Sequence, residues 1–479
     1  MTATGLLLSG SWTAHKDSAL HTVRSPYSGD ALEEIVLASP GDTEAALESA
    51  VAGADLWRNT PAHQRTAVLL KAASIADERI ESLAHTISSE MGKSIREARG
   101  EATRAGEILR LSAFEGSQRY GESLPLDANL GTGFDKIGFT LPQPVGVVVA
   151  ITPFNYPSLL VLHKVGPALA AGNAVILKPA LAAPLTAIAL AQCFVDAGLP
   201  PGVLSVLNGS GSEIGTQLVA DPRVNKVSFT GSTRVGEMIT KIAGIKKLSL
   251  ELGASSPVIV TKHADLEQAA HSISLGGYVN AGQVCIAAQR IIVEESVREE
   301  FLSVLIPKVE AITIGDPTQE ETMVGTLVNE SEAIRVESAI QKAVADGGRL
   351  LTGGERSGTL ITPAIVDGVE GDHEFAQEEL FGPAVSITSA SDLDHAFEIA
   401  NSTKYGLGSG IFTHDQDESI RAMREIDSGV VHINWTPLWR ADLMPYGGMK
   451  SSGIGKEGVR TTVNEMTEWK TVIMHSRVQ

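Results

Sequence analysis

The stretch that decides the fold is Val145-Gly146-Val147-Val148-Val149-Ala150-Ile151, an apolar run of residues that favour β-structure. It leads into a proline-rich turn, Thr152 to Pro157, and then into a helix-forming stretch that ends at Gly172-Asn173. A second apolar run, Ala174 to Leu177, follows directly. Apolar strands that alternate with helices predict βαβ units, in which helices cover both faces of a parallel sheet.

The alternation continues toward the C-terminus. A helix is expected over Pro184 to Ala197, and strands are expected over Val203 to Leu207 and Lys226 to Phe229. Together these elements predict a Rossmann-like arrangement. A second alternating set begins at about Leu250 and runs to roughly Asn434, and it predicts a second α/β domain.

Three further segments accompany these two sets. Thr43 to Arg119 is charged, alanine-rich and helix-forming, so it is expected to wrap the first sheet. Tyr120 to Pro144 and Glu465 to Gln479 fit neither domain, and the second of them contains a β-type run. Each predicts either a strand extension that pairs with another subunit or an edge strand of the same subunit. The pattern alone favours neither alternative.

Length, charge and cysteine content restrict the class of protein. A chain of 479 residues is long enough for two or three domains and a large core. Its net charge of −19 argues against nucleic acid as a partner, because phosphate binding needs a basic face. Two cysteines cannot form a disulfide framework, and the chain begins without a basic, signal-like region. No apolar run approaches the ~18 residues of a membrane span, so we expect a cytoplasmic protein without a membrane partner.

Three polar residues outline covalent aldehyde oxidation. Cys285, in Gly282-Gln283-Val284-Cys285, is the candidate nucleophile, because a thiol attacks a carbonyl carbon. Glu251, in Leu250-Glu251-Leu252-Gly253, is the candidate base that prepares water to release the resulting thioester. Asn155 follows the first strand and offers an amide donor to an oxyanion. Taken singly, each has an ordinary alternative: a buried core cysteine, a surface glutamate and a turn-shaping asparagine.

Residues at the ends of the expected strands suit a dinucleotide. Lys178 ends the second strand, where its ammonium group can hydrogen-bond ribose hydroxyls. The loop with Gly231 and Ser232 passes from a strand to a helix, where glycine admits a pyrophosphate and the helix N-terminus favours the anion. Thr152 and Phe154, in the turn after the first strand, are assigned to the same cofactor. The alternative for the glycine loop is a tight turn with close helix packing.

These motifs together resemble the aldehyde dehydrogenase superfamily, and the resemblance covers nearly the whole chain. The runs that carry it are Pro153-Phe154-Asn155-Tyr156-Pro157, Gly166 to Asn173, Leu177-Lys178-Pro179, Phe229-Thr230-Gly231-Ser232, Leu250 to Gly253, Gly282 to Cys285, Glu379-Leu380-Phe381-Gly382-Pro383, Asn401 with Tyr405-Gly406-Leu407, and Pro445 to Gly453. Their order and spacing are those of the family. The resemblance therefore implies an α/β aldehyde dehydrogenase fold.

The resemblance also implies a division of the chain into three parts. Residues 1–119 and 145–250 are expected to form the Rossmann-like cofactor-binding domain, and residues 251–445 the α/β catalytic domain. Residues 120–144 and 465–479 are expected to form a small β oligomerisation domain. Because dimers and tetramers are the habit of the family, we expect a homodimer or a homotetramer.

Further cofactor residues follow from the resemblance alone. It implies that Glu379 binds the nicotinamide ribose and that Phe381 packs near the nicotinamide ring. Leu181 stands where many NAD-preferring members have glutamate, three residues after the position of Lys178. Without that carboxylate a 2′-phosphate meets less repulsion, so both NAD and NADP are kept as the cofactor. No metal ion is expected.

The presence of Glu251 bears on the reaction. CoA-acylating relatives lack this glutamate, because CoA rather than water resolves their thioester. We therefore predict oxidation of an aldehyde to the free acid through a Cys285 thiohemiacetal and thioester, with hydride transfer to NAD or NADP. One alternative is a CoA-acylating semialdehyde dehydrogenase. The other is an inactive structural or binding paralogue, which would lack the nucleophile or the base.

The substrate is expected to be a small aldehyde and, in one interpretation, an anionic one. The sequence around Val284 to Arg290 and Met444 to Arg460 resembles the lactaldehyde, non-phosphorylating glyceraldehyde-3-phosphate and phosphonoacetaldehyde dehydrogenase branch. Guanidinium groups hold phosphate, sulfonate or carboxylate bidentately, although each arginine has a structural alternative. His163 stands where succinate-semialdehyde dehydrogenases carry arginine, which disfavours that substrate. The candidate substrate-binding residues are Arg104, Arg290, Arg440 and His163.

Overall fold

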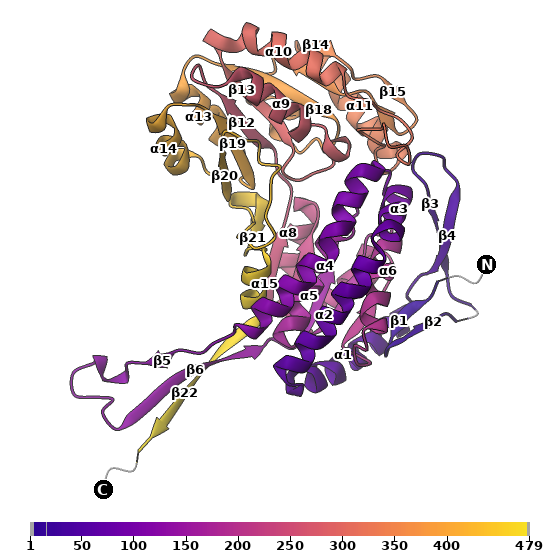
Figure 1. Ribbon diagram of the computed structural model, residues 1–479, viewed down its shortest axis with the longest axis vertical. Helices are drawn as coiled ribbons and strands as arrows, with labels where there is room; N and C mark the ends of the chain where they lie inside the picture. The colour runs from indigo at the N-terminus through magenta and orange to yellow at the C-terminus, as the bar shows by residue number, and fades with distance from the viewer. Residues whose placement is uncertain (1–3, 16, 477–479) are drawn as a thin grey trace.

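The structure, a computed structural model, describes residues 4–15 and 17–476 and contains two large sheets with their helices (Figure 1). The first sheet has eight strands. In spatial order they are β2 (Ser11–Thr13), β1 (Leu6–Leu8), β9 (Leu204–Val206), β8 (Ala174–Lys178), β7 (Val147–Ile151), β10 (Lys226–Thr230), β11 (Lys247–Glu251) and β21 (Gly453–Ile454).

The strand order of the first sheet creates a crevice. Strands β9, β8, β7, β10 and β11 are parallel, whereas β1 and β21 pair antiparallel to them. The chain steps from β7 through β8 to β9 and then places β10 on the other side of β7. Open α/β sheets bind ligands at the carboxyl ends of their strands where the order reverses, which here lies between β7 and β10. The predicted Rossmann-like α/β fold class is confirmed.

Helices cover both faces of this sheet, because its central strands are apolar on both sides (Figure 1). Val148 and Ala150 of β7 belong to one apolar cluster, and Val147 and Val149 belong to the other. The helices are α1 (Pro40–Asn59), α2 (Ala62–Glu78), α3 (Ile80–Met91), α4 (Ile95–Ser117), α5 (Leu159–Ala171), α6 (Leu185–Asp196), α7 (Thr216–Ala220), α8 (Thr233–Ile242) and α15 (Val459–Glu465).

The second large sheet has seven strands and its own helices. In spatial order the strands are β14 (Arg349–Thr352), β17 (Ala364–Asp367), β18 (Ala384–Ala390), β13 (Ala288–Glu294), β12 (Ser256–Val260), β19 (Gly408–Phe412) and β20 (Val430–Ile433). All neighbours are parallel except β14 and β17. The helices are α9 (Leu266–Gly276), α10 (Arg298–Glu310), α11 (Glu330–Ala345), α12 (Glu374–Gln377), α13 (Leu393–Asn401) and α14 (Gln416–Glu425).

A three-stranded antiparallel arm projects away from both sheets (Figure 1). It consists of β5 (Ser123–Leu124), β6 (Lys136–Pro144) and β22 (Thr467–His475), and β22 pairs with β6 along its whole length. The two segments that fitted neither predicted domain therefore pair with each other within the chain, and neither is an edge strand of a large sheet. Two short hairpins complete the strands: β3 (Leu20–Arg24) with β4 (Ala31–Val36), and β15 (Arg356–Ser357) with β16 (Leu360–Ile361).

The strand expected at Val145 to Ile151 begins two residues later than expected. Gly146 has a φ of +122°, and its N–H donates to the Asn173 side-chain oxygen at 2.9 Å. The Val147 N–H donates to the Asn225 side-chain oxygen, also at 2.9 Å. At this point side-chain amides, rather than a neighbouring strand, accept hydrogen bonds from the backbone N–H groups. Strand pairing therefore starts only at β7.

Candidate active site

Cys285, Glu251 and Asn155 line a single pocket of about 100 Å³. Glu251 ends β11 and Asn155 follows β7, so both come from the first sheet, whereas Cys285 lies in the loop before β13 of the second sheet. The pocket therefore forms only where the two sheets meet. The other polar side chains that line it are Arg104, Tyr156, His163, Thr230, Arg440, Tyr446 and Glu457.

A left-handed turn presents Cys285 to the pocket. Asn280, Ala281 and Gly282 have φ angles of 52°, 54° and 71°. A Cβ on Gly282 would lie 2.0 Å from the Gly382 carbonyl oxygen, so this position requires glycine. Downstream, the Cys285 sulfur lies 3.0 Å from the Tyr446 hydroxyl oxygen. Burial raises the pKa of Cys285 to about 12, although the contact with Tyr446 acts in the opposite direction.

Glu251 is a buried carboxylate that the rest of the site leaves free. Its side chain is 3% exposed, and neither oxygen has a hydrogen-bond partner within the described residues. Burial and then the nearby carboxylate of Glu457 raise the pKa of Glu251 well above its ordinary value. A carboxyl group with high basicity and two free oxygens is suited to accept a proton.

Asn155 directly contacts the loop that carries Cys285, the candidate nucleophile. This loop is called the nucleophile loop. Its amide nitrogen donates one hydrogen bond to the Gln283 carbonyl oxygen at 2.8 Å, which leaves its second N–H available. Over residues 4–15 and 17–476 the backbone N–H of Cys285 also makes no hydrogen bond. These two N–H groups are the donors that an oxyanion on a Cys285 adduct can use.

Two of the predicted substrate-binding residues share one carboxylate. Arg104 forms an ion pair with Asp442, and the His163 Nε2 atom lies 3.0 Å from the same carboxylate. Burial opposes ionisation of Asp442, but the hydrogen bonds from His163 and Arg104 lower its pKa to about 2. Burial lowers the pKa of His163, so at neutral pH this side chain is uncharged. Of the two, Arg104 supplies the positive charge.

Arg440 lies closer to the reacting groups. Its guanidinium group lies over the Tyr446 ring, 3.9 Å from the centroid, and its Nη2 atom lies 3.4 Å from a Glu457 oxygen. The Arg440 Nε atom is buried, and no hydrogen-bond partner for it lies in the described chain. Glu457 also pairs with Lys164, which donates to the Thr230 hydroxyl at 2.7 Å. Arg440 thus keeps unused donor capacity at the pocket wall.

Arg290 is not brought to this pocket. It lies in β13, 1% exposed, and donates to the Ile399 carbonyl oxygen at 2.6 Å. Burial lowers its pKa to about 10. Arg290 is therefore a structural arginine. The other three predicted substrate-binding residues, Arg104, Arg440 and His163, line the pocket.

The predicted cofactor residues gather beside the same site. Thr152 directly follows β7, and its buried hydroxyl has no partner in the part of the chain that the structure describes. Lys178 ends β8, and burial lowers its pKa to about 8. The Gly231 N–H donates to the Glu251 carbonyl oxygen at 3.0 Å, and Ser232 directly precedes α8. Unused polar atoms at these strand ends fit the ribose and phosphate groups of a dinucleotide.

The second sheet contributes the remaining cofactor candidates. The Glu379 carboxylate accepts a hydrogen bond from the Ala254 N–H at 3.2 Å. Phe381 meets Phe154 edge to face, with ring centroids 5.9 Å apart and the planes at 86°. Candidate cofactor residues of the second sheet therefore contact residues that follow strands of the first sheet.

Residues 4–15 and 17–476 contain neither a cluster of metal-binding side chains nor a membrane-spanning helix. No group of three or more His, Cys, Asp or Glu side chains is arranged to hold a metal ion. No helix there has the length and apolar character needed to cross a membrane.

Sequence reasoning missed two residues that line the pocket, Tyr446 and Glu457, and two that form ion pairs with lining residues, Lys164 and Asp442. Tyr446 occurs in a run that resembles the family, but its contact with Cys285 was not anticipated. Lys164, Asp442 and Glu457 also received no role. Their partners are far away in the sequence, so no local pattern marks them.

A Rossmann-like sheet, a pocket cysteine and a buried free carboxylate at one crevice define an aldehyde-oxidising dehydrogenase. The sequence profile described as "Aldehyde dehydrogenase family" matches residues 12–472, and the chain belongs to this family. It is accordingly an aldehyde dehydrogenase, an enzyme class that uses NAD or NADP. The predicted enzyme class is confirmed.

Two curated relatives and one solved structure are similar to this chain over nearly its whole length. The chain is 43% identical to 3-sulfolactaldehyde dehydrogenase of Priestia aryabhattai, over 98% of both chains. It is 38% identical to lactaldehyde dehydrogenase of Methanococcus vannielii, over 98% of this chain and 100% of that one. Glyceraldehyde-3-phosphate dehydrogenase GapN from Methanocaldococcus jannaschii, solved in complex with NADP, has a TM-score of 0.92 at 37% identity. That match covers 96% of this chain and 100% of the other.

Proposed function

We propose that this enzyme oxidises a small aldehyde with an anionic group, of the 3-sulfolactaldehyde type, to the free carboxylic acid. The observation that carries the proposal is one pocket that holds a cysteine, an amide donor, a free carboxylate and two arginines. The relatives support it, because one is named for a sulfonated aldehyde and a similar structure for a phosphorylated one. A volume of about 100 Å³ suits a short carbon chain.

Cys285 forms the covalent bond to the substrate. The Cys285 thiol releases its proton to solvent water, and the thiolate sulfur then adds to the aldehyde carbon, so the carbonyl oxygen becomes an oxyanion. The free N–H groups of Asn155 and Cys285 stabilise this oxyanion. Glu251 later removes a proton from the water that attacks the thioester carbon, and the acid leaves as the thiol is restored.

When bound, a nicotinamide cofactor would supply the acceptor for the hydride that leaves the thiohemiacetal carbon. On the side of the first sheet, the residues that would hold the dinucleotide are Lys178, Thr152, Gly231 and Ser232. Glu379 and Phe381 from the second sheet, with Phe154, would hold its nicotinamide half. Leu181 leaves no carboxylate to repel a 2′-phosphate, so either NAD or NADP remains compatible with these residues.

Arg440 and Arg104 are proposed to bind the acid group of the substrate. Arg440 has a buried Nε atom without a partner in the described chain, whereas Arg104 shares Asp442 with His163. A substrate sulfonate or phosphate would accept charged hydrogen bonds from both guanidinium groups. Arg440 is expected to contribute more, because its donor atoms are less fully used.

The substrate panel that tests this consists of 3-sulfolactaldehyde, glyceraldehyde 3-phosphate and lactaldehyde, each with NAD and with NADP. For Arg440→Met we expect KM for the two anionic aldehydes to rise by about 10- to 100-fold, the loss of charged hydrogen bonds. KM for uncharged lactaldehyde should change little. The matched control is Arg110→Met, because Arg110 lies exposed on α4 and pairs with Asp77. Equal effects of Arg440→Met on charged and uncharged aldehydes would contradict the anion-binding role.

The CoA-acylating alternative is tested in the same assay. With Glu251 free in the pocket, water is expected to resolve the thioester without CoA. A strict requirement for CoA would overturn the hydrolytic reaction.

We propose that each large sheet, together with its helices, forms one domain and that the arm forms a third. Residues 1–119 and 145–250 then form the cofactor-binding domain, residues 251–445 the catalytic domain, and residues 120–144 and 465–479 the oligomerisation domain. The arm supports assembly into a homodimer or homotetramer, because it carries exposed apolar side chains. These include Ile137, Trp469 and Met474. A cytoplasmic location remains a prediction from the two free thiols.

A further inference from the structure

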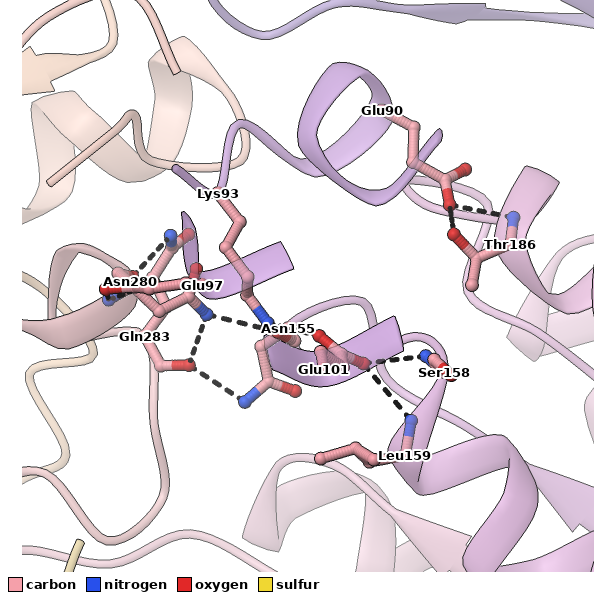
Figure 2. A network of polar contacts seen from close by, with 10 residues as sticks. All are labelled: Glu90, Lys93, Glu97, Glu101, Asn155, Ser158, Leu159, Thr186, Asn280 and Gln283. Carbon is pink, nitrogen blue, oxygen red and sulfur yellow. Dashed lines mark hydrogen bonds and ion pairs between the residues drawn. The ribbon is translucent and has the colours of Figure 1, made fainter. Parts of the chain in front are cut away.

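Two carboxylates of helix α4 accept hydrogen bonds from the nucleophile loop, which carries Cys285, and from the turn that carries Asn155. Glu97 and Glu101 lie one turn apart on α4, on the same side of the helix. The Glu97 oxygens accept hydrogen bonds from the Asn280 N–H at 3.0 and 3.2 Å. A Glu101 oxygen accepts from the N–H groups of Ser158 and Leu159 at 2.8 and 3.1 Å (Figure 2).

We propose that Glu97 is a positioning residue for Cys285, and that α4 sets the spacing between Cys285 and Asn155 through Glu97 and Glu101. This inference rests on the proposed function, in which Cys285 is the nucleophile. Glu97 does not line the Cys285 pocket. It therefore acts through the backbone of Asn280 and touches none of the reacting atoms.

The turn that Glu97 binds needs an external support. Asn280 and Ala281 both have left-handed backbone angles, which residues with a Cβ adopt only where the surroundings hold them. Asn280 is the first residue of this left-handed run, and its N–H is the group that Glu97 accepts. Cys285 follows a few residues later, so the direction in which the turn leaves Asn280 decides where the sulfur lies.

Asn280 also joins the two catalytic loops. Its side-chain nitrogen donates to the Asn155 carbonyl oxygen at 3.1 Å and lies 3.4 Å from the Gln283 carbonyl oxygen (Figure 2). The Asn155 amide donates to that same Gln283 oxygen. A shift of Asn280 would therefore move the nucleophile loop and the oxyanion donor relative to each other.

A buried cation holds the other carboxylate in place. Lys93 and Glu101 form an ion pair in which both side chains are 1% exposed. The Lys93 ammonium group also lies over the Tyr156 ring, 3.6 Å from its centroid. Because Tyr156 directly follows Asn155 in the chain, this contact and the Glu101 hydrogen bonds to Ser158 and Leu159 hold the turn that comes after Asn155. The position of α4 is thereby transmitted to both loops.

The experiment compares Glu97→Leu and Glu97→Gln with the wild-type enzyme in single turnovers. Two rates are measured: formation of reduced cofactor at saturating aldehyde, and acylation by p-nitrophenyl acetate, which needs the thiol and oxyanion donors but no hydride acceptor. In Glu97→Leu both rates are expected to fall by about 10- to 100-fold, because the nucleophile is misplaced. KM for the cofactor should stay unchanged. Glu97→Gln keeps an acceptor oxygen for the Asn280 N–H and should recover part of both rates.

The matched control is Glu115→Leu. Glu115 is a buried carboxylate on the same helix, and it pairs with Arg460 at 3.0 Å, away from the pocket. This variant is expected to lose stability while both single-turnover rates per folded molecule stay at the wild-type value. Thermal unfolding of each variant gives the folded fraction used for that normalisation.

Two results would overturn the positioning role: wild-type rates in Glu97→Leu, or equal rate losses in Glu97→Leu and Glu115→Leu. Failure of the proposed function would give a different result. In that case Cys285→Ala would still form reduced cofactor. The two failures are distinguishable within the same set of proteins.

Discussion

Burial controls the acid–base behaviour of both reacting side chains. It raises the pKa of Cys285 to about 12 and the pKa of Glu251 well above its ordinary value. A pKa of about 12 means that the Cys285 thiol holds its proton at neutral pH in the free enzyme. The raised pKa of Glu251 makes its carboxylate a stronger base. The thiolate, which is the reactive form of cysteine, therefore becomes more abundant as the pH rises.

Alkylation of the free enzyme by iodoacetamide tests this at Cys285. With a pKa of about 12, the thiolate fraction grows about tenfold per pH unit, so the rate should climb without a plateau up to about pH 10. Mass spectrometry of the Cys285 peptide measures the rate separately from that of Cys193, which is buried in α6. A plateau near pH 8 would show that burial does not raise this pKa.

Residue type and local motif locate the candidate catalytic residues in the pocket better than the candidate substrate-binding residues. Cys285, Glu251 and Asn155 were selected from short motifs, and the fold brings them into one pocket. Arg290 was chosen for its closeness to Cys285 in the sequence. Successive residues of a strand point to opposite faces, however, and in β13 its side chain points into the protein.

At the scale of elements, the turn before Cys285 limits what the nucleophile loop tolerates. We expect Gly282→Ala to combine backbone strain with a clash against the Gly382 carbonyl oxygen. The control is Gly358→Ala, where φ is also positive, at +61°, but no atom lies within 4 Å of the added Cβ. Urea unfolding should show a loss of about 1–2 kcal/mol for the control. Gly282→Ala should lose a further ~1–3 kcal/mol. Equal losses would mean that the close approach is unimportant.

Half of the strands of the first sheet, β7 to β10, could be predicted from hydrophobic runs and turn residues. Strand β8, helix α6 and strand β10 lie within one residue of their expected bounds at each end. The pairing of β6 with β22 was not predictable from local pattern, because these strands lie at opposite ends of the chain. Propensity indicates that a segment is a strand, whereas the identity of its partner depends on tertiary packing.

For the whole molecule, ion pairs between distant segments complete the site. Lys164 of α5 pairs with Glu457, and Arg104 of α4 pairs with Asp442. Both acidic partners come from the segment between the second sheet and α15. Local sequence patterns do not reveal such contacts, which is why short motifs mark Cys285, Glu251 and Asn155 but not the charges around them.

The meeting of the two sheets is the central structural claim. Glu251 and Asn155 belong to the first sheet and Cys285 to the second, so the reaction sequence depends on how the sheets dock. Because this docking brings both side chains to one pocket, we expect Cys285 to form the thioester and Glu251 to act only in its hydrolysis.

Rapid mixing of enzyme, aldehyde and cofactor tests that claim most directly. For Glu251→Gln we expect a burst of reduced cofactor equal to the enzyme concentration, followed by a steady-state rate about 10²- to 10⁴-fold below wild type. Cys285→Ala should give no burst. A wild-type steady-state rate in Glu251→Gln, or a burst in Cys285→Ala, would contradict the account.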